Sequence, residues 1–188
     1  MSGRTVIKQS IIGAIVAGLV LFLWGFLYWG LNPLPYTAWS QPTDDAALGE
    51  SLKQFLPDSG MYYVPGPHLD EDEATRLHAA GPIALISFTR EGVPMMDPGV
   101  MGLGFVHGMV FAFLLALTLV KAAPAVDSYA NGIKFCLLLG VVAGFFIHFG
   151  DAIWWRMAWS WKFHTFLYTV TSFAITGAVL MKFVSRKA

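Results

Sequence analysis

The chain is poor in charge. Only 13% of its 188 residues are Asp, Glu, Lys or Arg, whereas soluble domains usually contain about 25%. The 12 basic and 12 acidic residues balance, so the chain lacks the basic excess of a nucleic-acid-binding protein. Hydrophobic residues make up 56% of the sequence, and this excess of apolar surface predicts a membrane protein.

Cysteine and catalytic motifs are also scarce. Cys136 is the one cysteine, so the chain cannot form an internal disulfide or run a thiol–disulfide relay. The sequence has no Walker loop, no C-x-x-C-H haem attachment site and no H-E-x-x-H pair. No residue qualifies as catalytic on these grounds, and a non-enzymatic role is favoured.

Four long apolar segments dominate what is present. Each is long enough to supply the roughly 20 residues that a helix needs to cross a bilayer. The segments are Ile7–Leu31, Val100–Val120, Ile133–Trp155 and Phe163–Val184. The first is longer than a signal-peptide core and has no small-residue cleavage site after it, so we expect it to be retained. The predicted fold is an all-α membrane protein, a bundle of four transmembrane helices.

Basic residues predict the orientation. Cytoplasmic loops carry an excess of Lys and Arg, and the bases that flank the spans on one side are Arg4, Lys8, Lys121, Lys134, Lys182, Arg186 and Lys187. Both termini are therefore predicted to be cytoplasmic. Arg156 and Lys162, in the short turn before the last span, run against this rule. Six tryptophans are predicted as anchors at the outer interface, where indole rings prefer to lie: Trp24, Trp29, Trp154, Trp155, Trp159 and Trp161.

Residues 32–99 are predicted to form a small extracytoplasmic α+β insert between residues 1–31, the first helix, and residues 100–188, which hold the other three. The insert is acidic, with three bases (Lys53, Arg76, Arg90) against ten acids: Asp44, Asp45, Glu50, Asp58, Asp70, Glu71, Asp72, Glu73, Glu91 and Asp97. The proline, glycine and capping residues of the insert predict a helix at Ala46–Phe55 capped by Thr43, a strand at Met61–Val64, a helix at Asp70–Ala80 and a strand at Ile83–Thr89.

The acidic run at residues 70–73 has two interpretations. It is a solvated helix N-terminus, which the helix dipole favours, or it is a divalent-cation site. The run lacks the spaced ligands and the glycine of a calcium loop, so the first interpretation is preferred.

Four ionisable residues lie within or beside the spans: His107, His148, Asp151 and His164. Polar groups at membrane depth are costly and are the first place to look for function. Counting about 1.5 Å per residue from the predicted helix ends places all four in the outer leaflet. The preferred interpretation is a structural cluster that ties helices together through hydrogen bonds.

Two other interpretations of these residues stay open. His107 and His148 lie at matched depth on different helices, so they are candidates for ligating a b-type haem or a metal ion. A proton or solute path is the other possibility, although no ionisable group continues it into the inner half.

Small residues predict close helix packing. Gly104-x-x-x-Gly108 and Gly140-x-x-x-Gly144 each place two glycines on one helix face, where they let backbones approach. Such faces serve either the packing of the four helices or the docking of another subunit.

Several short motifs together resemble a group of small four-span bacterial inner-membrane proteins without an established activity. The motifs are Trp24-Gly25 with Trp29, Leu34-Pro35, Ser59-Gly60-Met61-Tyr62, Pro65-Gly66-Pro67, Gly81-Pro82-Ile83-Ala84 and His148 followed by Trp154-Trp155. The resemblance implies the architecture and a location in the bacterial inner membrane. Some members carry a carboxylate in the last helix, and this chain has none from Phe163 to Val184.

The functional hypothesis from sequence is a non-enzymatic accessory or scaffolding subunit of a larger membrane complex. Its expected partners are membrane lipids and other membrane-protein subunits, and no cofactor is required. A small haem- or metal-binding protein is one alternative, and a binder of lipid or a small solute is another.

Overall fold

A computed structural model describes residues 3–124 and 126–184 of the chain. It is mostly helical and contains four helices long and apolar enough to cross a membrane, together with a two-stranded sheet. The prediction of four such helices is therefore confirmed. Residues 40–95 form one compact unit, and the remaining described residues form the other.

The first span combines two helix types. Helix α1 (Gly3–Gly25) continues without a break into η1 (Phe26–Leu31), which is a π-helix, and a short 3₁₀ helix η2 (Leu34–Ala38) follows. Pro33 and Pro35 stop the regular helix because proline has no backbone N–H to donate. Residues 32–39 group with the helices in one compact unit.

The second span, α4 (Pro98–Lys121), begins with a side-chain cap. The Asp97 carboxylate accepts a hydrogen bond from Gly99 N at 2.7 Å, and Pro98 occupies the first turn. Both features are typical of helix N-termini. The span therefore starts at residue 98, close to the predicted position.

The third span also changes helix type. It runs through α5 (Tyr129–Gly144), the π-helix η3 (Phe145–Phe149) and α6 (Gly150–Trp154), and Ser128 caps its start by accepting from Asn131 N at 3.2 Å. The fourth span, α7 (Trp159–Val184), begins a turn earlier than the predicted Phe163. Two of the four spans thus contain π-helical turns, which the sequence pattern did not indicate.

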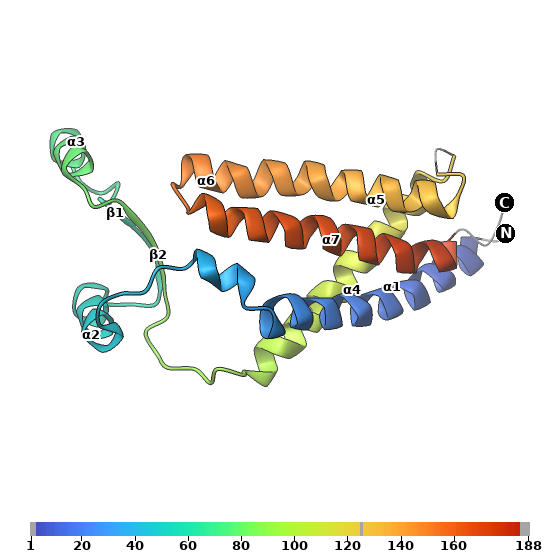
Figure 1. Cartoon of the computed structure of the whole chain (residues 1–188), viewed down its shortest axis with the longest axis horizontal. Coiled ribbons are helices and arrows are strands. Elements are labelled where there is room, and N and C mark those ends of the chain that lie inside the picture. Colours follow the sequence, from blue (N-terminus) through green and yellow to red (C-terminus); the bar gives the residue numbers. More distant parts are fainter. Residues whose placement is uncertain (1–2, 125, 185–188) are drawn as a thin grey trace. The chain divides into compact units, whose positions relative to one another are not determined.

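Helix α7 is the centre of the helical unit. It packs against α5 on one side and α1 on another, while α4 packs mainly along α1 and reaches α7 less extensively (Figure 1). The buried core between these helices is rich in small side chains, among them Ala17, Ala112 and Ala116, with Leu119 and Leu180 filling the remaining space. Small residues allow this close approach.

Two glycines illustrate how closely the helices approach one another. A Cβ placed at Gly18 would lie 2.6 Å from Met109 Cγ on α4, and one at Gly140 would lie 2.8 Å from Phe173 Cβ on α7. Both positions lie where another helix leaves no room for a side chain. Within the predicted motifs, Gly144 meets Phe166 in the same way and Gly108 makes ordinary contact with Leu21, whereas Gly104 has no neighbour within 4 Å of such an atom.

The insert contains helix, strand, helix and strand in the predicted order. Its elements are α2 (Asp45–Phe55), β1 (Gly60–Val64), α3 (Glu71–Ala80) and β2 (Ala84–Phe88). The strands pair antiparallel, with Gly60 opposite Phe88 and Val64 opposite Ala84. The cap of α2 is Asp44, which accepts from Ala47 N at 2.9 Å, rather than the predicted Thr43.

Polar contacts hold the insert together. The Arg90 guanidinium donates to the carbonyls of Lys53 and Leu56 at 3.0 and 2.9 Å, which satisfies the C-terminus of α2. The backbone N–H of Arg90 donates to Ser59 Oγ at 2.9 Å, and that hydroxyl donates to Glu91 at 3.1 Å. These contacts join α2 to the two-stranded sheet.

The insert has almost no hydrophobic core. Of residues 40–95, only Leu56 and Gly66 are buried. Large apolar side chains are exposed instead, including Phe55 at 75%, Met61 at 66% and Met95 at 100%. A two-stranded sheet is marginally stable in water without a face to pack against, so this unit lacks the burial that usually stabilises a domain.

Candidate functional site

The predicted membrane-depth polar residues lie toward the end of the spans where η1 finishes, α6 finishes and α7 begins; we call this the tryptophan-rich end. All seven tryptophans lie near these helix ends: Trp24 in the last turn of α1, Trp29 in η1, Trp39 directly after η2, Trp154 and Trp155 at the end of α6, and Trp159 and Trp161 in the first turn of α7. Polar groups and aromatic rings therefore occur together in the elements that form this end.

His148 lies on the π-helix η3 and contacts α7. A hydrogen bond of 2.7 Å joins His148 Nε2 and Thr169 Oγ1, while His148 Nδ1 is buried and has no hydrogen-bond partner among the residues that the structure describes. π-Helical turns occur frequently at functional sites because they leave the regular hydrogen-bond ladder. The histidine predicted from sequence thus occupies an irregular helix turn, and the described residues hydrogen-bond only one of its two ring nitrogens.

Asp151 pairs with a lysine rather than with a predicted histidine. Lys162 Nζ lies 2.8 Å from Asp151 Oδ2, and the lysine side chain is only 10% exposed. The pair joins α6 to the first turn of α7. By sequence, Lys162 is only a base that runs against the orientation rule, whereas in the structure this lysine is the nearly buried partner of Asp151.

The other two predicted histidines have different surroundings. His164 enters this region through its backbone, because its carbonyl accepts a hydrogen bond from the Tyr28 hydroxyl at 2.8 Å. His107, on α4, lines a cavity between α1, α4 and α7. Thr169 lines the same cavity and also bonds His148, so this threonine relates the two histidines.

Aromatic side chains connect η1, η2 and α7. The rings of Trp29 and Tyr168 lie 5.2 Å apart, those of Trp29 and Trp161 lie 5.4 Å apart, and Trp161 contacts Trp39 at 5.2 Å. The Tyr36 hydroxyl donates to the Trp29 carbonyl at 2.7 Å. This cluster fixes the π-helical end of the first span against the start of the last one. Trp24 contacts Tyr28, whereas Trp154, Trp155 and Trp159 expose more than half of their surface.

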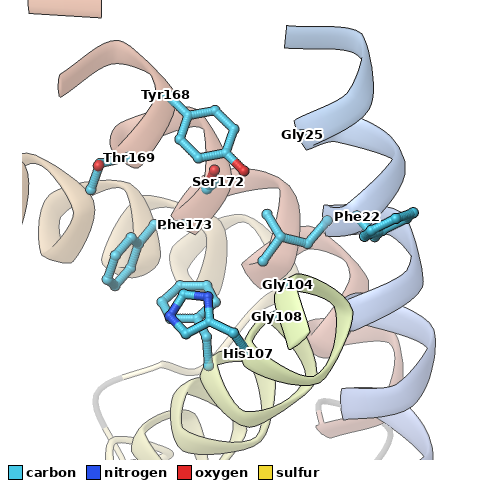
Figure 2. A pocket seen from close by; sticks show the side chains of 11 residues that line it. Phe22, Gly25, Gly104, His107, Gly108, Tyr168, Thr169, Ser172 and Phe173 are labelled. Atoms are coloured by element: carbon cyan, nitrogen blue, oxygen red, sulfur yellow. The ribbon is translucent and has the colours of Figure 1, made fainter. Parts of the chain in front are cut away.

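The cavity beside His107 has a volume of about 190 Å³. Its wall is mostly apolar and includes the aromatic rings Phe22, Phe111 and Phe173. Figure 2 shows His107 on α4 and Tyr168 on α7 at different sides of this space, with Phe22 of α1 closing another side. The cavity therefore combines aromatic walls with a few polar groups, which is the usual make-up of a small-molecule site.

A metal site requires several ligating side chains close together. Within residues 3–124 and 126–184, no three His, Cys, Asp or Glu side chains gather at one point. A metal site with three protein ligands is therefore not assembled by the described residues. A haem ligated through His148 Nε2 would also require the bond to Thr169 to break.

Two acids of the run at residues 70–73 make hydrogen bonds within helix α3 itself. The Asp70 carboxylate caps α3 by accepting from Glu73 N at 2.9 Å, and Glu73 binds the Arg76 guanidinium through two hydrogen bonds of 2.7 and 3.0 Å. These hydrogen bonds lower the pKa of the Glu73 carboxyl and raise the pKa of Arg76. Two of the four acids thus have a structural role at a helix N-terminus.

Comparison with known proteins gives no family model, no curated protein and no solved structure that matches this chain.

Proposed function

We propose that the chain is a non-enzymatic accessory or scaffolding subunit of a larger complex in a bacterial inner membrane. One observation carries this proposal: residues 40–95 bury only Leu56 and Gly66. A unit with so little burial gains too little from the hydrophobic effect to offset its conformational entropy. A partner surface that covers the insert supplies the missing burial.

The exposed side chains of the insert indicate what kind of partner surface would fit it. Exposed apolar side chains, such as Phe55 and Met61, alternate with acids, of which residues 40–95 contain nine against three bases. An interface of this kind combines a central apolar patch with a charged rim. The partner is therefore a membrane-protein subunit whose facing surface is apolar at its centre and basic around it.

Orientation follows from the flanking charges. The bases at Lys121, Lys134 and Lys182 favour the cytoplasm, so the insert, which connects the other ends of the first two spans, falls on the opposite side. The proposed partner surface is therefore extracytoplasmic. The tryptophan-rich end, at the same ends of the spans as the insert, then lies at the outer headgroup level.

The test uses the full chain, tagged and expressed at its native level. Extraction in mild detergent is expected to yield a high-mass assembly with partner chains at fixed stoichiometry. Phe55→Lys and Met61→Lys each place a charge in the exposed apolar surface and are expected to release the partners while the chain stays in the membrane.

Matched controls are Gln54→Glu and Thr89→Glu, which add a charge at exposed polar residues of the same unit with the sign that a basic partner rim tolerates. These variants should keep the partners. Recovery of the unaltered chain as a clean monomer, without co-eluting proteins, contradicts the proposal.

A further inference from the structure

The cavity between α1, α4 and α7 has in its wall a hydroxyl that makes no hydrogen bond of good geometry with the residues that the structure describes. This is the hydroxyl of Ser172, which is 6% exposed and lines this space. The Tyr168 hydroxyl lies beside it (Figure 2). Buried hydroxyls nearly always have a partner, so an unpaired one in the wall of a cavity points to an absent acceptor or donor.

The polar groups around the cavity favour a hydrogen-bond acceptor. The hydroxyls of Ser172 and Tyr168 and the imidazole ring of His107 are all side-chain groups that can donate a hydrogen bond. Carbonyl oxygens accept such bonds without donating any. A ligand with a carbonyl group matches this set of donors.

The charge and shape of the cavity wall limit the class of ligand further. No Lys, Arg, Asp or Glu lines the cavity, and an ionised group without a counter-charge at this depth is costly. Phe22, Phe111 and Phe173 supply aromatic walls that pack well on flat or ring-shaped groups. These features favour an uncharged, largely apolar ligand.

From these features we infer that the cavity binds an uncharged, lipid-soluble molecule with a carbonyl acceptor, which lies against Ser172 and Tyr168. Two membrane components share this chemistry: the ring of a quinone and the ester of an uncharged lipid. The binding site is independent of the insert and of the partner proposed above.

The glycines of α4 provide a matched pair of variants. Gly104 lines the cavity and Gly102 does not, and a Cβ at either position meets no atom within 4 Å. Gly104→Leu therefore adds a side chain at the cavity wall, where its Cβ has room, while Gly102→Leu adds the same side chain to the same helix outside the cavity.

The experiment titrates the purified full chain, in micelles without added lipid, with a ten-carbon-tailed ubiquinone analogue and, separately, with a short-chain diacylglycerol. Binding is followed by the shift in melting temperature and by intrinsic fluorescence. We expect saturable one-to-one binding of at least one probe to the unaltered chain and to Gly102→Leu. Gly104→Leu should bind that probe at least tenfold more weakly.

The pattern of binding identifies the source of the ligand. Saturation by the quinone alone assigns a quinone, and saturation by diacylglycerol alone assigns a lipid ester. Ser172→Ala, which removes only the hydroxyl, is expected to weaken binding about fivefold and serves if Gly104→Leu is not folded. No saturable binding of either probe, or equal binding by Gly104→Leu and Gly102→Leu as folded proteins, overturns the inference.

Discussion

Lys162 Nζ lies 2.8 Å from Asp151 Oδ2, and this ion pair holds the first turn of α7 against α6. The lysine is nearly buried, so removal of the acid leaves a charge without a partner. Breaking a buried pair costs about 3–5 kcal/mol, and the partial exposure of Asp151 places this pair at the lower end. We expect Asp151→Asn to reduce the free energy of unfolding by that amount, measured by unfolding in detergent micelles.

The double variant Asp151→Leu with Lys162→Met provides the control. Replacement of both charged partners by apolar side chains is often neutral, so the double variant should recover most of the lost stability. If Asp151→Asn unfolds at the same point as the unaltered chain, the pair does not stabilise the turn.

Close packing of α5 on α7 gives a second prediction. A Cβ at Gly140 would lie 2.8 Å from Phe173 Cβ and 3.1 Å from Val170 Cα, and the second of these atoms belongs to the backbone. Overpacking of this kind costs about 1–3 kcal/mol. Gly140→Ala should therefore lower the melting temperature of the purified chain.

Gly102→Ala is the matched comparison, because a Cβ there has no neighbour within 4 Å. It should leave stability unchanged or raise it by up to about 1 kcal/mol, since alanine favours helix more than glycine does. Equal melting temperatures for the two alanine variants would show that α5 and α7 separate without cost.

Arg90 gives a prediction for the insert. Its guanidinium donates to two carbonyls at the end of α2, and Arg90→Gln removes the charge and shortens the reach. Amide hydrogens of residues 53–64 should then exchange faster in a hydrogen-exchange experiment on the full chain. Arg76→Gln, a loss of charge on α3 in the same unit, should leave these amides unchanged, and equal acceleration by both variants contradicts the assigned role.

The Glu73–Arg76 pair predicts a pH dependence. Because hydrogen bonds from Arg76 lower the pKa of Glu73, the ionised carboxylate stabilises α3 at pH values above the pKa of the unfolded chain. This stabilisation is lost as the pH falls through the lower pKa of the folded insert. A carboxyl titration by NMR should show the lowered pKa, and Arg76→Gln should return it toward the ordinary value of glutamate.

Apolar run length and helix or strand breakers made much of the architecture predictable. Long apolar segments have few alternatives to a spanning helix, and Pro57, Gly60 and Gly81 separate the elements of the insert. Local competition explains the smaller differences: Asp44 caps α2 in place of its neighbour Thr43 because its carboxylate reaches Ala47 N.

The candidate site was less predictable because its contacts depend on how each helix is rotated about its axis. His148 and Asp151 share one helix face by spacing, yet one bonds Thr169 and the other Lys162. Neither partner carries a motif that a single sequence reveals. A search for acids close to Lys162 across the turn would have found the ion pair, whereas the unpaired hydroxyl of Ser172 follows only from the packed helices.

The π-helical turns η1 and η3 have a consequence for insertions and deletions in these spans. A π-turn holds one residue more than an α-turn, and each residue advances an α-helix by about 100°. Loss of one residue from 145–149 would restore a regular helix without shortening a loop, and would leave the faces of α5 and α6 on either side aligned as they are. In an alignment of relatives, a one-residue gap inside a transmembrane segment at this point would therefore record a change of helix type and not an error.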